Sequence, residues 1–246
     1  MKNPYRYKFA AALSAGVLLV LGVAILGQRV DAAPPSGAGV SGTIKLDGMA
    51  PHQKPIDMSK EPSCAAIHKD KPITTEGVVA GAGGGLANVV VYVSQGLSGN
   101  EAPSSAPASI TQKGCQYIPH VVVLDAGQHM KVINDDQTSH NIHPQPVKNQ
   151  EWNKSQPPGS PPFDVTWANE EIAVPVKCNI HPWMHGYIAV VKGPYGISDE
   201  NGSFSLNLPP GNYTLTAWQE TYGTQTQAVT VAAGKAATAN FTFKAK

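Results

Sequence analysis

The sequence has 246 residues, enough for one or two ordinary domains with a sizeable core. Only 14% of the residues are charged, and the 24 glycines and 21 prolines favour short strands joined by turns over long helices. Four of the 18 basic residues but only one of the 17 acidic residues lie within residues 1–32, so the remainder is slightly acidic. Nothing in this balance points to nucleic acid as a partner.

The first 32 residues have the pattern of an export segment. Basic residues come first, an apolar run covers residues 9–27, and small residues up to Ala32 suit cleavage before Ala33. The run is also long enough to span a bilayer, so a cleaved signal peptide and an uncleaved N-terminal anchor both remain open. In either case we expect export to the periplasm or the cell surface, with membrane contact only through this segment.

The first half of the exported part reads as strands separated by turns. Residues 33–39 form a linker, and the alternating pattern of residues 40–47 predicts a first strand that ends at a D-G turn. Residues 51–70 are polar and proline-containing and indicate an irregular excursion. Residues 86–93 are almost continuously apolar, which predicts a strand buried on both faces. The Ser-, Gly- and Pro-rich residues 94–109 read as a crossing between units.

The middle of the chain predicts further strands at residues 115–124, 129–134 and 171–176. A long polar connection covers residues 144–162. Connections of this length inside a compact domain are uncommon and often functional, so this one either shields a site, docks a partner or is inert.

Two short motifs in this region carry metal-ligand chemistry. Cys178, His181 and Met184 follow a C-x2-H-x2-M spacing in a short loop between two strand-like runs, and His140 lies in S-H-N-I-H after an apolar run. Soft thiolate and thioether donors beside imidazole suit copper better than hard cations. Two His and one Cys with a weak axial Met is an arrangement suited to electron transfer.

These motifs, S-H-N-I-H and C-N-I-H-P-W-M, resemble those of the cupredoxins, most closely the amicyanin-like branch. The resemblance covers residues 110–192 and implies one type 1 (blue) copper site. It also implies that Asn141 steadies the loop near the thiolate. The ligands it implies are His140, Cys178 and His181, with Met184 axial.

The resemblance further implies a one-electron carrier or relay. Electrons would pass through the edge of His181, which in the family reaches the surface within an apolar patch, here Pro182 and Trp183. The partner would be a redox protein, such as a cytochrome or a dehydrogenase. No second copper centre, haem motif or catalytic triad is visible, so we expect a protein that is not an enzyme.

A zinc site is the alternative for the same ligands. A tetrahedral Cys-His-His site using His140 or His143 with Cys178, closed by His185, would hold zinc. The remaining cysteines, Cys64 and Cys115, form a pair in an oxidising compartment, where a disulfide bond is the expected state.

The C-terminal part resembles a second family. The segments D-E-N-G at 199–202 and L-P-P-G at 208–211 resemble the second half of a carboxypeptidase regulatory-like (prealbumin-like) β-sandwich, covering residues 196–246. The first half of that module resembles residues 40–96. The copper unit would then be inserted into one sandwich; the rival is a tandem in which residues 40–109 belong to the copper unit.

The expected fold is therefore all-β: a Greek-key cupredoxin β-sandwich and a second, prealbumin-like β-sandwich behind an N-terminal apolar helix. Two other functions stay open. One is an extracytoplasmic scaffold that binds carbohydrate or protein through the second sandwich. Tyr213, Trp218 and Tyr222 could line a glycan site there, but core packing explains these aromatic residues more simply. The other is copper storage or delivery by the same ligands.

Overall fold

The computed structural model describes residues 39–99 and 102–245. The predicted signal peptide or anchor lies outside the described residues, as does nearly all of the linker. Within these described ranges, no helix is both long enough and apolar enough to cross a membrane.

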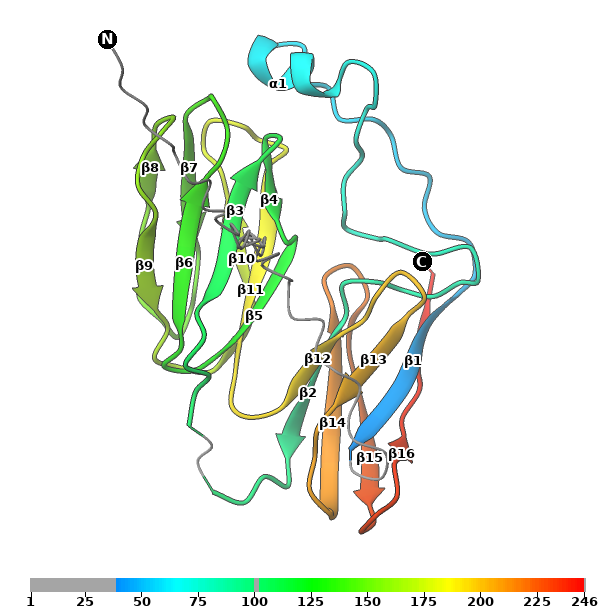
Figure 1. Ribbon diagram of the computed structural model, residues 1–246. Coiled ribbons are helices and arrows are strands. Elements are labelled where there is room, and N and C mark those ends of the chain that lie inside the picture. The colour runs from blue at the N-terminus through cyan, green and yellow to red at the C-terminus, as the bar shows by residue number, and fades with distance from the viewer. Residues whose placement is uncertain (1–38, 100–101, 246) are drawn as a thin grey trace, which may run out of the picture. The chain divides into compact units, whose positions relative to one another are not determined.

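The described strands form four sheets (Figure 1). Two of them combine strands from the two ends of the described chain. One has the order β13-β1-β16, with β17 also paired to β1, and the other has the order β12-β2-β14-β15. Their bounds are β1 Val40–Asp47, β2 Val90–Gln95, β12 Tyr195–Ile197, β13 Ser203–Leu206, β14 Gly211–Gln219, β15 Gly223–Val231, β16 Ala237–Thr238 and β17 Phe241–Lys244.

The other two sheets come from the middle of the chain. Their orders are β5-β11-β10-β7-β8 and β4-β3-β6-β9. The bounds are β3 Ala108–Lys113, β4 Gln116–Ile118, β5 Val121–Asp125, β6 His129–Asn134, β7 His140–Pro144, β8 Lys154–Gln156, β9 Phe163–Thr166, β10 Glu171–Lys177 and β11 His185–Val191. The one helix among the described residues is α1, Pro62–His68.

Strand pairing divides the described strands into two groups, a terminal unit from the two ends of the described chain and a middle unit between them. β1 pairs antiparallel with β13 and parallel with β17, and β2 pairs antiparallel with β12 and β14. Strands before residue 96 therefore share sheets with strands after residue 194, while strands between residues 108 and 191 pair among themselves. An inserted arrangement requires this pairing, and the domain layout itself stays a prediction.

Each unit has its own apolar core, built by period-2 alternation along the strands. In β14, Tyr213, Leu215 and Ala217 are buried in the core of the terminal unit. A second core fills the middle unit and includes Cys178 and Met184. A third cluster joins the units, with members from β2, β5, β11 and β14: Val90, Val121, Val123, Ala189, Val191 and Trp218.

Three segments differ from the sequence prediction. The excursion at 51–70 contains α1, which has a proline in its first turn but is too short to produce a clear helical periodicity. The predicted strand at 115–124 is divided into β4 and β5 around Pro119, which cannot donate to a ladder. The polar connection at 144–162 contains β8, which pairs with β7.

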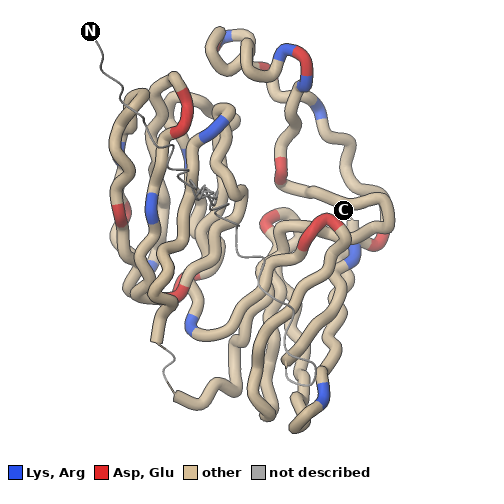
Figure 2. The backbone as a smooth tube through the Cα atoms, in the orientation of Figure 1, with Lys and Arg blue, Asp and Glu red and all other residues tan. Residues whose placement is uncertain are grey.

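Charged residues are sparse along both units (Figure 2). Glu171, at the start of β10, is nevertheless buried and is only 6% exposed. Its carboxylate accepts hydrogen bonds from the backbone N–H groups of Val147, Lys148 and Asn149 and from the Asn149 side chain. Burial alone would raise the pKa of Glu171, but these four donors outweigh it and lower the pKa. Glu171 thus fixes the start of the 144–162 connection.

We expect Glu171→Gln to lower the free energy of unfolding at neutral pH by about 2 kcal/mol, since a neutral amide replaces a charged acceptor. A lowered native pKa means that the unfolded state binds more protons, so this stabilisation is present at neutral pH and is lost as the pH falls through the native pKa. Urea denaturation at neutral and acid pH checks this. The difference between wild type and variant should shrink in acid; a difference that stays constant would contradict the assignment.

Candidate metal centre

The loop between β10 and β11 folds through local main-chain bonds. The N–H of Cys178 donates to the carbonyl of Met184 at 3.0 Å, and the N–H of Met184 donates to the carbonyl of His181 at 2.9 Å. These bonds close a tight turn directly after β10. The C-x2-H-x2-M spacing therefore places the Cys178 and His181 side chains close together.

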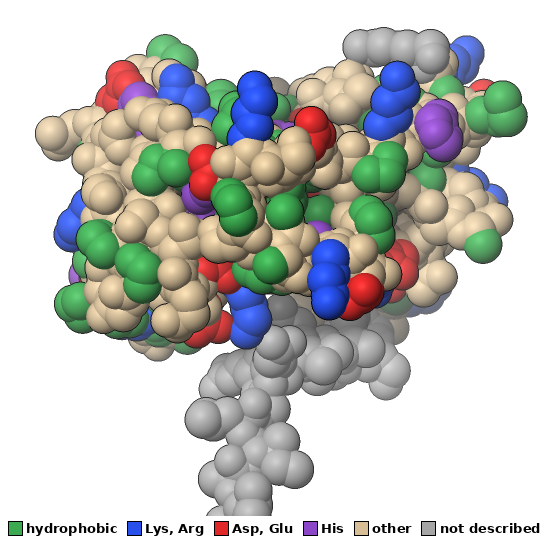
Figure 3. Space-filling model, turned by 90° about the horizontal axis from the view of Figure 1, so that it is seen from above, with side chains coloured by type: hydrophobic (Ala, Val, Ile, Leu, Met, Phe, Trp, Pro, Cys, Tyr) green, Lys and Arg blue, Asp and Glu red, His purple; other side chains and the backbone are tan. Residues whose placement is uncertain are grey.

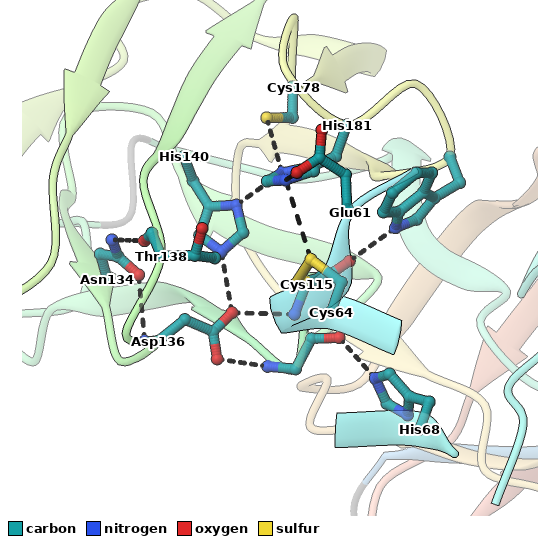
Figure 4. The surroundings of a disulfide bond; sticks show 12 residues. Glu61, Cys64, His68, Cys115, Asn134, Asp136, Thr138, His140, Cys178 and His181 are labelled. Carbon is teal, nitrogen blue, oxygen red and sulfur yellow. Dashed lines mark hydrogen bonds and ion pairs between the residues drawn. A yellow bond between two sulfur atoms is a disulfide. The ribbon is translucent and has the colours of Figure 1, made fainter. Parts of the chain in front are cut away.

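The loop meets the first residue of β7. The Nδ1 atoms of His140 and His181 lie 2.9 Å apart, and the Cys178 Sγ lies 3.7 Å from the His181 Nδ1 (Figure 4). The ligand atoms of all three residues lie within 4.8 Å of one another. The exposed fractions of His140, His181 and Cys178 are 0%, 0% and 3%. One sulfur and two ring nitrogens thus converge in a dry environment.

Met184 closes the loop and is 1% exposed. Its side chain belongs to the same core cluster as Cys178. Its role as an axial ligand stays a prediction.

Asn141 lies beside the thiol, where the resemblance placed it. Its Oδ1 accepts the N–H of Asn179 at 2.7 Å and lies 3.4 Å from the Cys178 Sγ. Its Nδ2 donates to Asn153 at 2.8 Å, which fixes the orientation of the amide. Asn141 therefore ties β7 to the start of the metal loop.

Asp136 is a further residue at this site, and the sequence motifs did not point to it. Its Oδ2 lies 2.8 Å from the Nε2 of His140, and its two oxygens also accept the N–H groups of Gly114 and Cys115 at 2.7 and 2.8 Å. Metal-binding histidines commonly donate their second ring N–H to a carboxylate. The available signal was the position of Asp136 four residues before His140.

The electrostatics favour the protonation states that a metal requires at Cys178 and His181, but not at His140. Burial alone would raise the pKa of Cys178, but hydrogen bonds from His140 and from backbone amides lower it. Burial and the neighbouring His140 both lower the pKa of His181. For His140, burial acts to lower the pKa, but Asp136 and Cys178 outweigh it and raise the pKa. A thiolate and a neutral imidazole are the forms that bind metals, so a metal ion that binds here must displace the proton that the raised pKa favours on His140.

The prediction that the edge of His181 reaches the surface is wrong. The Nε2 of His181 lies 3.7 Å from the Cys64 Sγ and 3.9 Å from the Glu61 carboxylate, at the start of α1 (Figure 4). Cys64 is joined to Cys115 by the disulfide bond that the sequence predicts. The excursion that carries α1 therefore covers the edge of this imidazole.

The proposed apolar contact patch is correspondingly smaller. Pro182 is exposed, but Trp183 is half-buried: it packs against the cluster around the disulfide bond and donates its Nε1–H to the carbonyl of Cys115 at 3.2 Å. Ile180, in the same loop, is 44% exposed. On the face seen in Figure 3, the hydrophobic side chains of the described residues are scattered and form no single large patch.

Two residues of the alternative zinc site, His143 and His185, lie outside this cluster. The Nε2 of His143 lies 2.6 Å from Glu151, and its Nδ1 lies 3.3 Å from Asn179. His185 is grouped with His120 and Glu220 instead of with Cys178. The cluster at Cys178 is therefore a thiol with two imidazoles and a nearby thioether, and this donor set fits copper.

The three aromatic residues considered for a glycan site pack into the apolar cores, the explanation that the sequence favours. Tyr213 and Trp218 are each 7% exposed and belong to core clusters, and Tyr222 packs against one of these cores. The three aromatic residues therefore serve packing.

The fold and the cluster define a mostly β protein with a copper-type donor set in its middle unit. The family model of the carboxypeptidase regulatory-like domain matches residues 191–244. No curated protein is significantly similar in sequence to this chain.

Among solved structures, the purple cupredoxin from Nitrosopumilus maritimus is 22% identical, with a TM-score of 0.29 over 34% of this chain and 99% of that one. Amicyanin from Paracoccus versutus is 16% identical, with a TM-score of 0.30 over 41% of this chain and 97% of that one. A copper-containing nitrite reductase from Thermus scotoductus is 19% identical, with a TM-score of 0.33; the match spans 39% of this chain and only 25% of the reductase. The chain thus resembles cupredoxins over part of its length and carries a carboxypeptidase regulatory-like match near its C-terminus.

We expect Asp136→Asn to lower the affinity for Cu(I) by about 10- to 100-fold, the usual effect of losing a carboxylate behind a histidine ligand. Competition with a chromophoric Cu(I) chelator measures this. Asp135→Asn is the matched control, because Asp135 is exposed and paired with Lys113 at the surface. Equal affinities of the two variants would show that Asp136 does not orient the ligand.

Proposed function

We propose that this chain is an exported type 1 copper protein that acts as a one-electron carrier or relay. The observation that carries the proposal is the convergence of the His140, Cys178 and His181 ligand atoms within 4.8 Å, with Met184 buried at the end of the same loop. When bound there, copper would supply a one-electron couple that these ligands tolerate in both oxidation states.

The residues around the ligands support this role. Asp136 and Asn141 hold His140 and the Cys178 loop through hydrogen bonds from outside the cluster. The core of the middle unit excludes water from the thiol. A site that is orientated in advance and dry changes little in geometry between oxidation states, as electron transfer requires.

The other parts of the proposal follow from the same residues. The copper unit, residues 110–192, is inserted into a carboxypeptidase regulatory-like sandwich formed by residues 40–96 and 196–246. The redox partner is a protein that docks at the exposed part of the loop around Ile180 and Pro182, and the chain acts outside the cytoplasm. No catalytic role is proposed for it.

The test is metal retention during redox cycling. The full chain is loaded with Cu(II), reduced and reoxidised repeatedly beside a Cu(I) chelator, while the visible spectrum is recorded. A carrier bleaches and recovers in each cycle and keeps its copper. Transfer of the copper to the chelator within the first reduced phase would contradict a carrier and favour storage or delivery.

A binding or scaffold role of the carboxypeptidase regulatory-like sandwich is the second candidate function. It is favoured by the family match at residues 191–244. A chain that stays colourless with Cu(II) would make this role the better account.

A further inference from the structure

A second group of potential metal ligands lies where the two units meet. It consists of His120, between β4 and β5; His185, the first residue of β11; and Glu220, directly after β14. One ligand atom from each lies within 4.8 Å of the others. The His120 and His185 rings pack edge to face with their centroids 5.4 Å apart. Two imidazoles from the middle unit thus face one carboxylate from the terminal unit.

The hydrogen bonds orient both rings, and they leave the Nε2 of His185 suited to bind a metal. The Nδ1 of His185 lies 2.9 Å from the carbonyl oxygen of Trp183, which can only accept, so Nδ1 carries the proton. In the neutral ring, Nε2 then keeps its lone pair. The Nε2 of His120 contacts the Glu220 carboxylate, and its Nδ1 lies 3.9 Å from the Glu76 carboxylate. A backbone carbonyl or a carboxylate behind the ring is the usual environment of a metal-binding histidine.

The surrounding backbone is shaped to hold this group. The His120 and Glu220 side chains are 3% and 9% exposed. A Cβ at Gly77 would lie 2.8 Å from the Glu220 Oε1, and a Cβ at Gly186 would lie 2.7 Å from the His120 carbonyl oxygen. Glycine at position 77 leaves space for the Glu220 carboxylate. Glycine at position 186 allows the backbone at His120 to approach closely. A buried histidine and carboxylate without a cation between them are costly to desolvate, which a bound ion would offset.

We propose that His120, His185 and Glu220 bind a divalent metal ion, Zn²⁺ in the first place, which joins the two units. Two imidazoles and one carboxylate are a common zinc ligand set, and a water molecule completes the coordination. This donor set is harder than the thiolate cluster, so the two sites select different metals. His185 follows Met184 directly, so an ion here also fixes the end of the copper loop.

The experiment measures zinc binding to the full chain after one equivalent of copper has been added. We expect calorimetry to show one zinc ion bound in wild type. Glu220→Gln and His185→Gln are each expected to weaken zinc binding by about 100-fold, at least as much as the loss of an outer partner does. Zinc should also raise the melting temperature of wild type but not of the two variants.

The matched control is Glu151→Gln, because Glu151 pairs with His143 in a similar contact, 2.6 Å long, that lacks a third ligand. This control should bind zinc like wild type. Zinc binding that is unchanged in Glu220→Gln, or absent from a folded wild type, would overturn the proposal. The Glu220 and His185 variants keep all residues of the Cys178 cluster. A loss of zinc binding in these variants therefore does not depend on which metal occupies that cluster. The circular dichroism and the copper spectrum of each variant show whether it has folded.

Discussion

Cys178→Ser is expected to abolish the intense visible absorption of the Cu(II)-loaded chain completely. The band of a blue copper site arises from charge transfer between a thiolate and the metal, and Cys178 is the only cysteine outside the disulfide bond. A serine hydroxyl is a hard donor with a high pKa, so it restores neither the bond between thiolate and copper nor the absorption band that arises from it. The absorption spectra of the two proteins, recorded with one equivalent of Cu(II), decide the matter.

Met184→Leu is the control for this experiment. Leucine preserves the volume in the core but removes the thioether, so the thiolate band should persist while the reduction potential changes. A band that survives in Cys178→Ser would place the chromophore elsewhere. A potential that is identical in Met184→Leu and wild type would refute the axial role of Met184.

Removal of the Cys64–Cys115 disulfide bond is expected to have two large effects. The bond closes a loop with a sequence separation of 51 residues. The double variant Cys64→Ser, Cys115→Ser should therefore lose about 2 to 4 kcal/mol of unfolding free energy. It should also free α1 from the edge of His181, so that a small reagent approaches the site more closely.

Chemical denaturation measures the first effect, and stopped-flow reduction of the copper-loaded chain by a small one-electron reductant measures the second. Glu61→Gln is the matched control, because it changes the other group near the His181 Nε2 but keeps the disulfide bond. We expect faster reduction in the double variant only. An unchanged rate in a less stable double variant would show that α1 keeps its position without the bond.

The loop of the metal centre could be predicted because its geometry is local. Cys178, His181 and Met184 lie within seven residues of chain, and two main-chain hydrogen bonds close the turn. His140 could be added because its motif follows a strand-like run, as a ligand on a sheet should. Asp136 was missed because a carboxylate four residues before a histidine is common in turns and carries no clear signal by itself.

The amino-acid sequence by itself determined most of the strands, the ligand types and the pairing of Cys64 with Cys115, since alternation, donor chemistry and cysteine count are properties of short segments or of composition. Only the tertiary structure decided what surrounds them. The cover of α1 over His181 joins residues 117 positions apart, and the contact of His120 with Glu220 joins residues 100 positions apart. Such contacts depend on how sheets pack against one another, and packing depends on all the side chains of both faces together.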